Sequence, residues 1–297
     1  MVAGLFLLGS ATGFWDVPMT VNVAAVERRL GRALMSRFLA AFSLGTLAGT
    51  AVGVLMVALG VPVAVHLAVV AAVIAGAVPA VARHHLPEHP RARTGTLPKG
   101  ARPGAWREPR TVLIGLVALA FAVAEGAGGN WVSVGVIDRH HTTATVGTLA
   151  YAAFLAALTA GRWLGPVVLD RAGPVTVVRT AAGITATGVV LFALGPSLGA
   201  ALAGSLLWGA GAALGFPVSM SAGAHDTARA AGRVGVITSI GYCGFLGGPP
   251  LIGFAGGRTT VGHALLLVVP ALMALAALLA DATRRTSSTP PAHTAHA

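Results

Sequence analysis

The sequence has few charged residues: Asp, Glu, Lys and Arg make up 10% of its 297 residues, whereas 55% are hydrophobic. Segments such as 38–59 and 262–280 are apolar on every side, and they lack the polar face that a soluble helix shows at a period of about 3.6 residues. The apolar blocks are about twenty residues long, which is the length that a helix needs to cross a bilayer. The composition therefore excludes an ordinary soluble domain and predicts an all-α integral membrane protein.

Cysteine is also scarce, because Cys243 is the only one and lies within an apolar segment. A disulfide framework and a multi-cysteine metal site are therefore excluded. The sequence contains no nucleophile with a base at a plausible spacing, no cluster of metal ligands and no glycine-rich phosphate loop. We therefore expect a protein that is not an enzyme and that needs neither a cofactor nor a metal.

Acidic residues number nine against twenty Lys and Arg, which gives a formal charge of +11. The hydropathy pattern predicts about nine spans: residues 3–23, 38–59, 61–82, 111–135, 146–168, 175–194, 198–220, 234–256 and 262–281. Eighteen of the twenty basic residues lie in the connections and helix ends on one side, and only Arg139 and Arg258 lie on the other.

The positive-inside rule places the basic side in the cytoplasm. The 83–110 connection and the C-terminus are therefore expected to be cytoplasmic, in a multi-pass protein of the cytoplasmic (inner) membrane. The position of the basic residues at the membrane surface explains the positive charge without a nucleic-acid partner. The partner that we expect is the lipid bilayer.

Several segments together resemble a branch of the major facilitator superfamily that is related to the fucose-type sugar:proton symporters. The residues that carry this resemblance are LFLLGSATGFWDVPMTVNVAAVERRLGRALMSRFLAAFSLGTLAG (5–49), EGAGGNW (125–131), LAYAAFLAALTAGRWLGPVVLDRAG (149–173), GAGAALGFPVSMSAG (209–223) and GYCGFLGGPPLIGF (241–254). In order, they resemble the fourth and fifth, the seventh, the eighth, the tenth and the eleventh transmembrane segments of that branch.

The resemblance implies a helical bundle of twelve segments in two halves, each half built from a pair of inverted three-helix repeats. About nine segments are present here, so the first repeat is expected to be missing. A start codon further upstream is our first explanation, and a decayed gene or a true truncation is the second. The expected domains are a partial N-terminal half (1–83), a cytoplasmic loop between the halves (84–110), a six-helix C-terminal half (111–283) and a disordered cytoplasmic tail (284–297).

Asp16 is the first candidate site residue, because a carboxylate in the middle of a span costs roughly 3 kcal/mol and calls for a partner, water or a proton. Gly13 and Thr20 share its helical face, so the three residues are expected to line a cavity. The resemblance implies that Asp16 is a protonation site. The alternative is a carboxylate that caps or pairs with a neighbouring helix.

Glu125 is the second acid within an apolar span, and it precedes a run of glycines that would let its helix bend. It is expected either to bind a proton or a substrate group, or to form a bracing ion pair. Asn130 and Trp131 follow it as cavity-lining candidates. The amide suits a hydroxylated solute and the indole suits a sugar face, although an interfacial position is the alternative for Trp131.

The stretch GRWLGPVVLDRAG (161–173) is a loose form of the superfamily's cytoplasmic-loop signature. The resemblance implies that Asp170, Arg171 and Gly173 act in gating, with a contribution from Arg162. The alternative is a solvated turn with cytoplasmic charges. The chain departs from the branch at four positions, where polar or titratable residues are replaced: Thr20, Leu39, Ala40 and Asn130.

We expect a secondary active transporter, a symporter that moves a small solute with protons by alternating access and works as a monomer in its full-length form. The alternatives are an efflux permease for drugs or metabolites, and a truncated membrane remnant or partner subunit that transports nothing.

Overall fold

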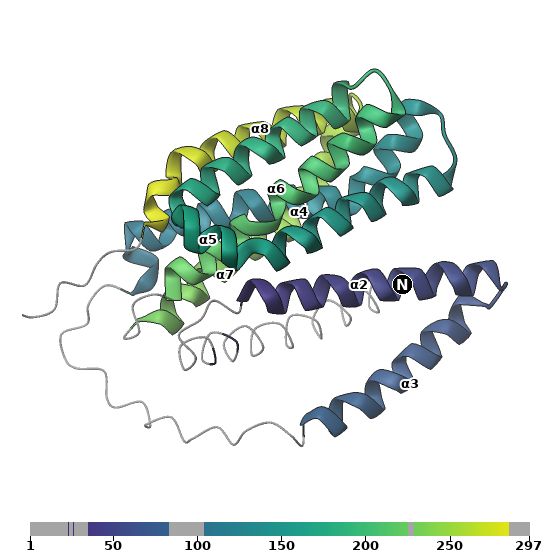
Figure 1. Ribbon diagram of the computed structural model, residues 1–297, viewed down its shortest axis with the longest axis horizontal. Coiled ribbons are helices and arrows are strands. Elements are labelled where there is room, and N and C mark those ends of the chain that lie inside the picture. The colour runs from purple at the N-terminus through teal and green to yellow at the C-terminus, as the bar shows by residue number, and fades with distance from the viewer. Residues whose placement is uncertain (1–22, 24–25, 27–34, 83–103, 225–228, 285–297) are drawn as a thin grey trace, which may run out of the picture. The chain divides into compact units, whose positions relative to one another are not determined.

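The computed structural model describes residues 23, 26, 35–82, 104–224 and 229–284. These residues contain helices and no strand, which confirms the predicted all-α class (Figure 1). Five of their helices are long and apolar enough to cross a membrane, judged by length and composition. The predicted span at 3–23, with Gly13, Asp16 and Thr20, lies outside the described residues.

The chain forms two compact units, of which one comprises residues 44–104 and the other comprises residues 1–43 together with 105–297. Helix α2 (Met35–Ala58) begins in the second of these units and ends in the first, and α3 (Val63–Ala82) follows it. The connection between α2 and α3 is short because Gly60 adopts a positive φ of 68°, which a glycine reaches without steric cost. Both helices lie where the sequence predicts spans.

The larger unit is a bundle of long helices, labelled α4 to α8 in Figure 1. Its elements are η1 (Ala105–Arg107), α4 (Pro109–His140), α5 (Ala144–Leu194), α6 (Leu198–Ala224), α7 (Ala230–Gly256), α8 (Val261–Leu279) and η2 (Ala280–Thr283). The helices are linked by connections of a few residues, which is typical of antiparallel neighbours.

Helix α5 contains two of the predicted spans. Its 51 residues are interrupted at Gly173, whose φ of 74° and ψ of 162° are not helical, and Pro174 follows directly. Proline cannot donate the backbone hydrogen bond that would continue the first helix, so the chain turns here. Residues 144–172 and 174–194 therefore correspond to the predicted spans 146–168 and 175–194.

The core of this unit lies where α5 packs against α6. Trp208 on α6 is fully buried and contacts Phe154 and Phe192 of α5, each with 5.7 Å between ring centroids. Its indole N–H donates to the carbonyl of Ala124 on α4 at 3.0 Å. At Gly209 the two backbones are so close that a Cβ atom would lie 2.1 Å from the carbonyl oxygen of Phe154. Helices in lipid associate through such close packing at small residues.

Candidate functional site

Glu125 lies in the middle of α4, sixteen residues after its first residue and fifteen before its last. At a rise of 1.5 Å per residue, Glu125 lies about 24 Å along the helix from its first residue and about 23 Å from its last. Its Oε2 atom accepts a hydrogen bond from Nη2 of Arg162 on α5, at 2.6 Å. The structure therefore places one acid and one base of the predicted set in direct contact within the bundle.

This ion pair is largely withdrawn from solvent, because 4% of the Arg162 side chain and 17% of the Glu125 side chain are exposed. A single buried charge is strongly unfavourable in a low-dielectric interior, whereas a pair with a short charge-assisted hydrogen bond compensates part of the desolvation. The carboxylate is the more accessible partner. This contact is compatible with the bracing role, and the binding of a proton or a substrate group by Glu125 stays a prediction.

Arg162 was predicted to act with the loop residues Asp170 and Arg171, but the structure places it in different surroundings. Its side chain is buried and points to α4, whereas Asp170 and Arg171 are exposed near the end of the first half of α5. The spacing explains the difference, because Arg162 lies eleven residues before the Gly173 break and therefore about 16 Å deeper along the helix. Gly173 itself supplies the turn.

Asn130 and Trp131 follow the glycine-rich part of α4, and they differ in their surroundings. Asn130 is exposed, and its amide donates to the carbonyl of Gly126 at 2.7 Å, one turn earlier in the same helix. The indole N–H of Trp131 donates to the carbonyl of Pro249 on α7 at 3.2 Å. This contact lies beside the Pro249–Pro250 pair, where α7 lacks two backbone donors.

A second charged cluster joins the first residues of α4 to those of α7, and the sequence reasoning missed it. Glu108 accepts from Nη1 of Arg229 at 2.7 Å, from Nε of Arg233 at 2.5 Å and from the hydroxyl of Thr111 at 3.0 Å. Hydrogen bonding from Arg233 is the main cause that lowers the pKa of Glu108 from 4.5 to about 2, against the effect of burial and with help from Arg229 and Thr111. The signal in the sequence that could have indicated this cluster is the pair Arg229 and Arg233, which are four residues apart.

Comparison with known proteins is consistent with this architecture. Residues 1–249 match the sequence profile of the Major Facilitator Superfamily. Two curated proteins are each 29% identical to the chain. One is an uncharacterised MFS-type transporter of Yersinia pestis, aligned over 96% of this chain and 73% of that protein. The other is the uncharacterised transporter y4wD of Sinorhizobium fredii, aligned over 96% and 74%.

No solved structure matches the chain significantly. The profile match nevertheless covers most of the sequence, and five of the described helices are long and apolar enough to cross a membrane. The chain belongs to the Major Facilitator Superfamily.

Proposed function

We propose that this membrane transporter moves a small solute by proton-coupled secondary active transport in the cytoplasmic membrane, with Glu125 as a group that takes up the proton. Family membership and the two relatives named as transporters support the general activity. The buried contact between Glu125 and Arg162 is the observation that carries the proton-coupled part of the proposal.

Protonation of Glu125 would remove the negative charge that balances Arg162. Loss of one member of a buried ion pair typically costs 3–5 kcal/mol, a rough range for well-enclosed pairs. Because each 1.4 kcal/mol changes an equilibrium about tenfold, this energy is sufficient to shift a two-state equilibrium by roughly a hundredfold or more. The ion pair joins α4 to α5. Protonation of Glu125 therefore weakens this contact and favours a conformation in which the pair no longer holds the two helices together.

The other predicted residues take supporting roles in the proposal. Asn130 offers an exposed amide one turn beyond Gly126 for a hydroxylated solute. Asp16, with Gly13 and Thr20, remains the predicted protonation site of the N-terminal part. Asp170 and Arg171 remain the predicted gating residues at the Gly173 break. The 83–110 connection and the C-terminus are placed in the cytoplasm, and the functional unit is a monomer.

Efflux of amphipathic compounds is the second candidate, and one observation favours it. Helix α7 exposes large apolar side chains, with Leu246 at 77% and Phe254 at 61% of full exposure. If these side chains lie along the transport path, they favour an apolar solute over a sugar.

The experiment places the full chain in proteoliposomes loaded with a pH-sensitive dye, under an inward proton gradient. A panel of sugars, organic acids, amines and amphipathic dyes is added from outside, and proton entry is recorded. We expect one solute class to accelerate proton entry in the wild type and in Asp138→Asn, which changes an exposed acid of the same helix. Glu125→Gln should abolish the response, and an unchanged response in that variant would reject the assignment.

A further inference from the structure

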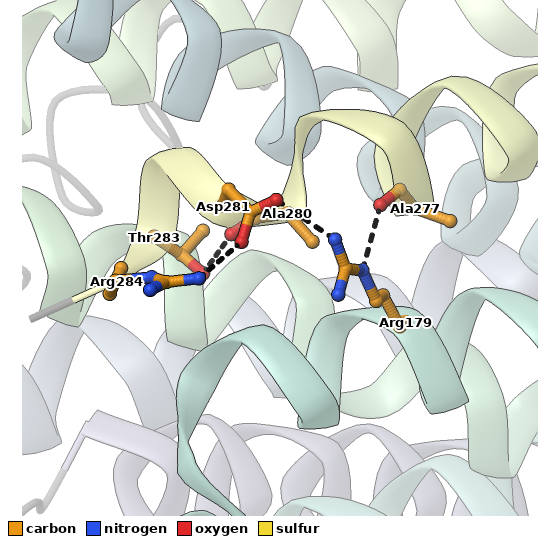
Figure 2. A network of polar contacts seen from close by, with 6 residues as sticks. All are labelled: Arg179, Ala277, Ala280, Asp281, Thr283 and Arg284. Carbon is orange, nitrogen blue, oxygen red and sulfur yellow. Dashed lines mark hydrogen bonds and ion pairs between the residues drawn. The ribbon is translucent and has the colours of Figure 1, made fainter.

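A third group of charged residues lies where α8 ends, away from the Glu125 site. Figure 2 shows Arg179 of α5 and Arg284 on the two sides of Asp281. Nη2 of Arg179 is 2.9 Å from Oδ2 of Asp281, and Nη2 of Arg284 is 2.9 Å from Oδ1. One carboxylate thus holds two guanidinium groups, and the three side chains together carry a net charge of +1.

Backbone carbonyls around the end of α8 accept hydrogen bonds from Arg179 and from a further arginine, Arg110. Nε of Arg179 donates to the carbonyl of Ala277 at 3.4 Å (Figure 2). Arg110 of α4 donates to the carbonyls of Ala282 at 3.0 Å and Arg284 at 2.6 Å. The last carbonyls of a helix lack partners within the helix, so arginines are favourable here. Capping explains why the side chains are ordered, but it does not use all of their donors.

Both arginines remain open to an external ligand. Half of the Arg179 side chain and 73% of the Arg284 side chain are exposed. A guanidinium has five N–H donors in a planar fork, which suits the oxygens of a phosphate. The Asp281 carboxylate accepts from one nitrogen of each group. The arrangement therefore presents two exposed cations, one on each side of Asp281.

An exposed apolar surface leads up to this charged end. On α8, Leu267 and Leu278 are exposed by 72% and 78%, and both precede Asp281 on one helical stripe. On α5, Val190 is exposed by 39% and lies eleven residues beyond Arg179, which places the two on one helical face. Helix α8 has 19 residues, so it is about 28 Å long, close to the thickness of the hydrocarbon core. The arginines therefore lie at the depth of the lipid headgroups.

We propose that Arg179 and Arg284 bind the headgroup phosphate of an anionic phospholipid, whose acyl chains lie along the exposed apolar residues of α5 and α8. The combination of charge and apolar surface favours this ligand over a free anion. A free phosphate would use the guanidinium groups but would gain nothing from the exposed Leu278 and Val190, whereas a lipid uses both the charge and the apolar surface.

The test uses the purified full chain in detergent and native mass spectrometry with phosphatidylglycerol and phosphatidylcholine at equal concentration. We expect the wild type to retain phosphatidylglycerol preferentially. A basic side chain near an anionic membrane surface contributes about 1 kcal/mol, or roughly fivefold, so Arg179→Gln/Arg284→Gln should bind this lipid roughly thirtyfold more weakly. Arg258→Gln is the matched control, because Arg258 is an exposed arginine that precedes the first residue of α8, at the opposite end of that helix from Asp281.

Two further variants keep the test decisive if the double variant does not fold, as judged by circular dichroism. Arg284→Gln alone changes the more exposed arginine and should weaken binding roughly fivefold, and Arg179→Lys/Arg284→Lys should restore most of the preference. Equal retention of both lipids by the wild type would overturn the proposal. So would unchanged binding by a folded glutamine variant, or displacement of the lipid by inorganic phosphate.

Discussion

Replacing Glu108 with Gln should destabilise the bundle of α4 to α8, because Glu108 ties the start of α4 to the start of α7. Its carboxylate binds Arg229 and Arg233, and 15% of its side chain is exposed. The pKa of Glu108, lowered from 4.5 to about 2, means that its ionised form stabilises the folded state. Solvent screens part of this effect near the end of the helix, so the substitution should cost about 1–2 kcal/mol.

The sign of the pH dependence follows from the direction of this shift. The folded state holds the carboxylate ionised to a lower pH than the unfolded state does, so the unfolded state binds the proton first. The contribution is therefore complete above a pH of about 4.5 and is lost as the pH falls toward 2. Glu108→Gln should lack this part of the pH dependence and should already be destabilised at neutral pH.

The assay is thermal unfolding of the full chain in detergent, followed by circular dichroism over a series of pH values. Asp138→Asn serves as the control, since it also removes one carboxylate from α4 but at an exposed position. An unfolding temperature of Glu108→Gln equal to that of the wild type at neutral pH would refute the reasoning. An unchanged acid dependence in that variant would refute it equally.

Four other substitutions test the packing and the backbone conformation of the bundle by the same unfolding assay. Trp208→Phe should lose about 1–3 kcal/mol, because it removes the indole N–H that donates to the buried carbonyl of Ala124. Gly209→Val should lose about 3 kcal/mol or more, since its Cβ would overlap the carbonyl oxygen of Phe154. Gly247→Ala, at a site with no atom within 4 Å, should change little. Gly173→Ala should lose about 1–3 kcal/mol, because a φ of 74° combined with a ψ of 162° is a backbone conformation that essentially only glycine adopts.

The helices were predictable from the sequence because each apolar block must satisfy its own backbone hydrogen bonds in lipid. The break within α5 was also readable, since Gly173 and Pro174 stand together between two apolar blocks. The helix ends were less predictable. Helix α4 extends to His140, beyond the predicted end at 135, because polar residues such as Asp138 and Arg139 continue a helix outside the apolar block.

The partners of the site residues were not predictable. Glu125 stood out as an acid in an apolar segment, but its contact with Arg162 joins residues that are 37 positions apart on different helices. The contact of Trp131 with Pro249 spans 118 positions. Hydropathy and residue spacing determine which face of a helix a residue occupies, but not which neighbouring helix meets that face. Helix packing in three dimensions supplies this information.

The most direct test of the central claim compares two transport modes of Glu125→Gln in proteoliposomes, with the solute identified by the dye screen. One mode is accumulation driven by a pH gradient, and the other is exchange of labelled for unlabelled solute without a gradient. If Glu125 carries the coupled proton, the variant should lose accumulation and keep exchange, while Asp138→Asn keeps both. Accumulation at the wild-type level in Glu125→Gln would contradict the account.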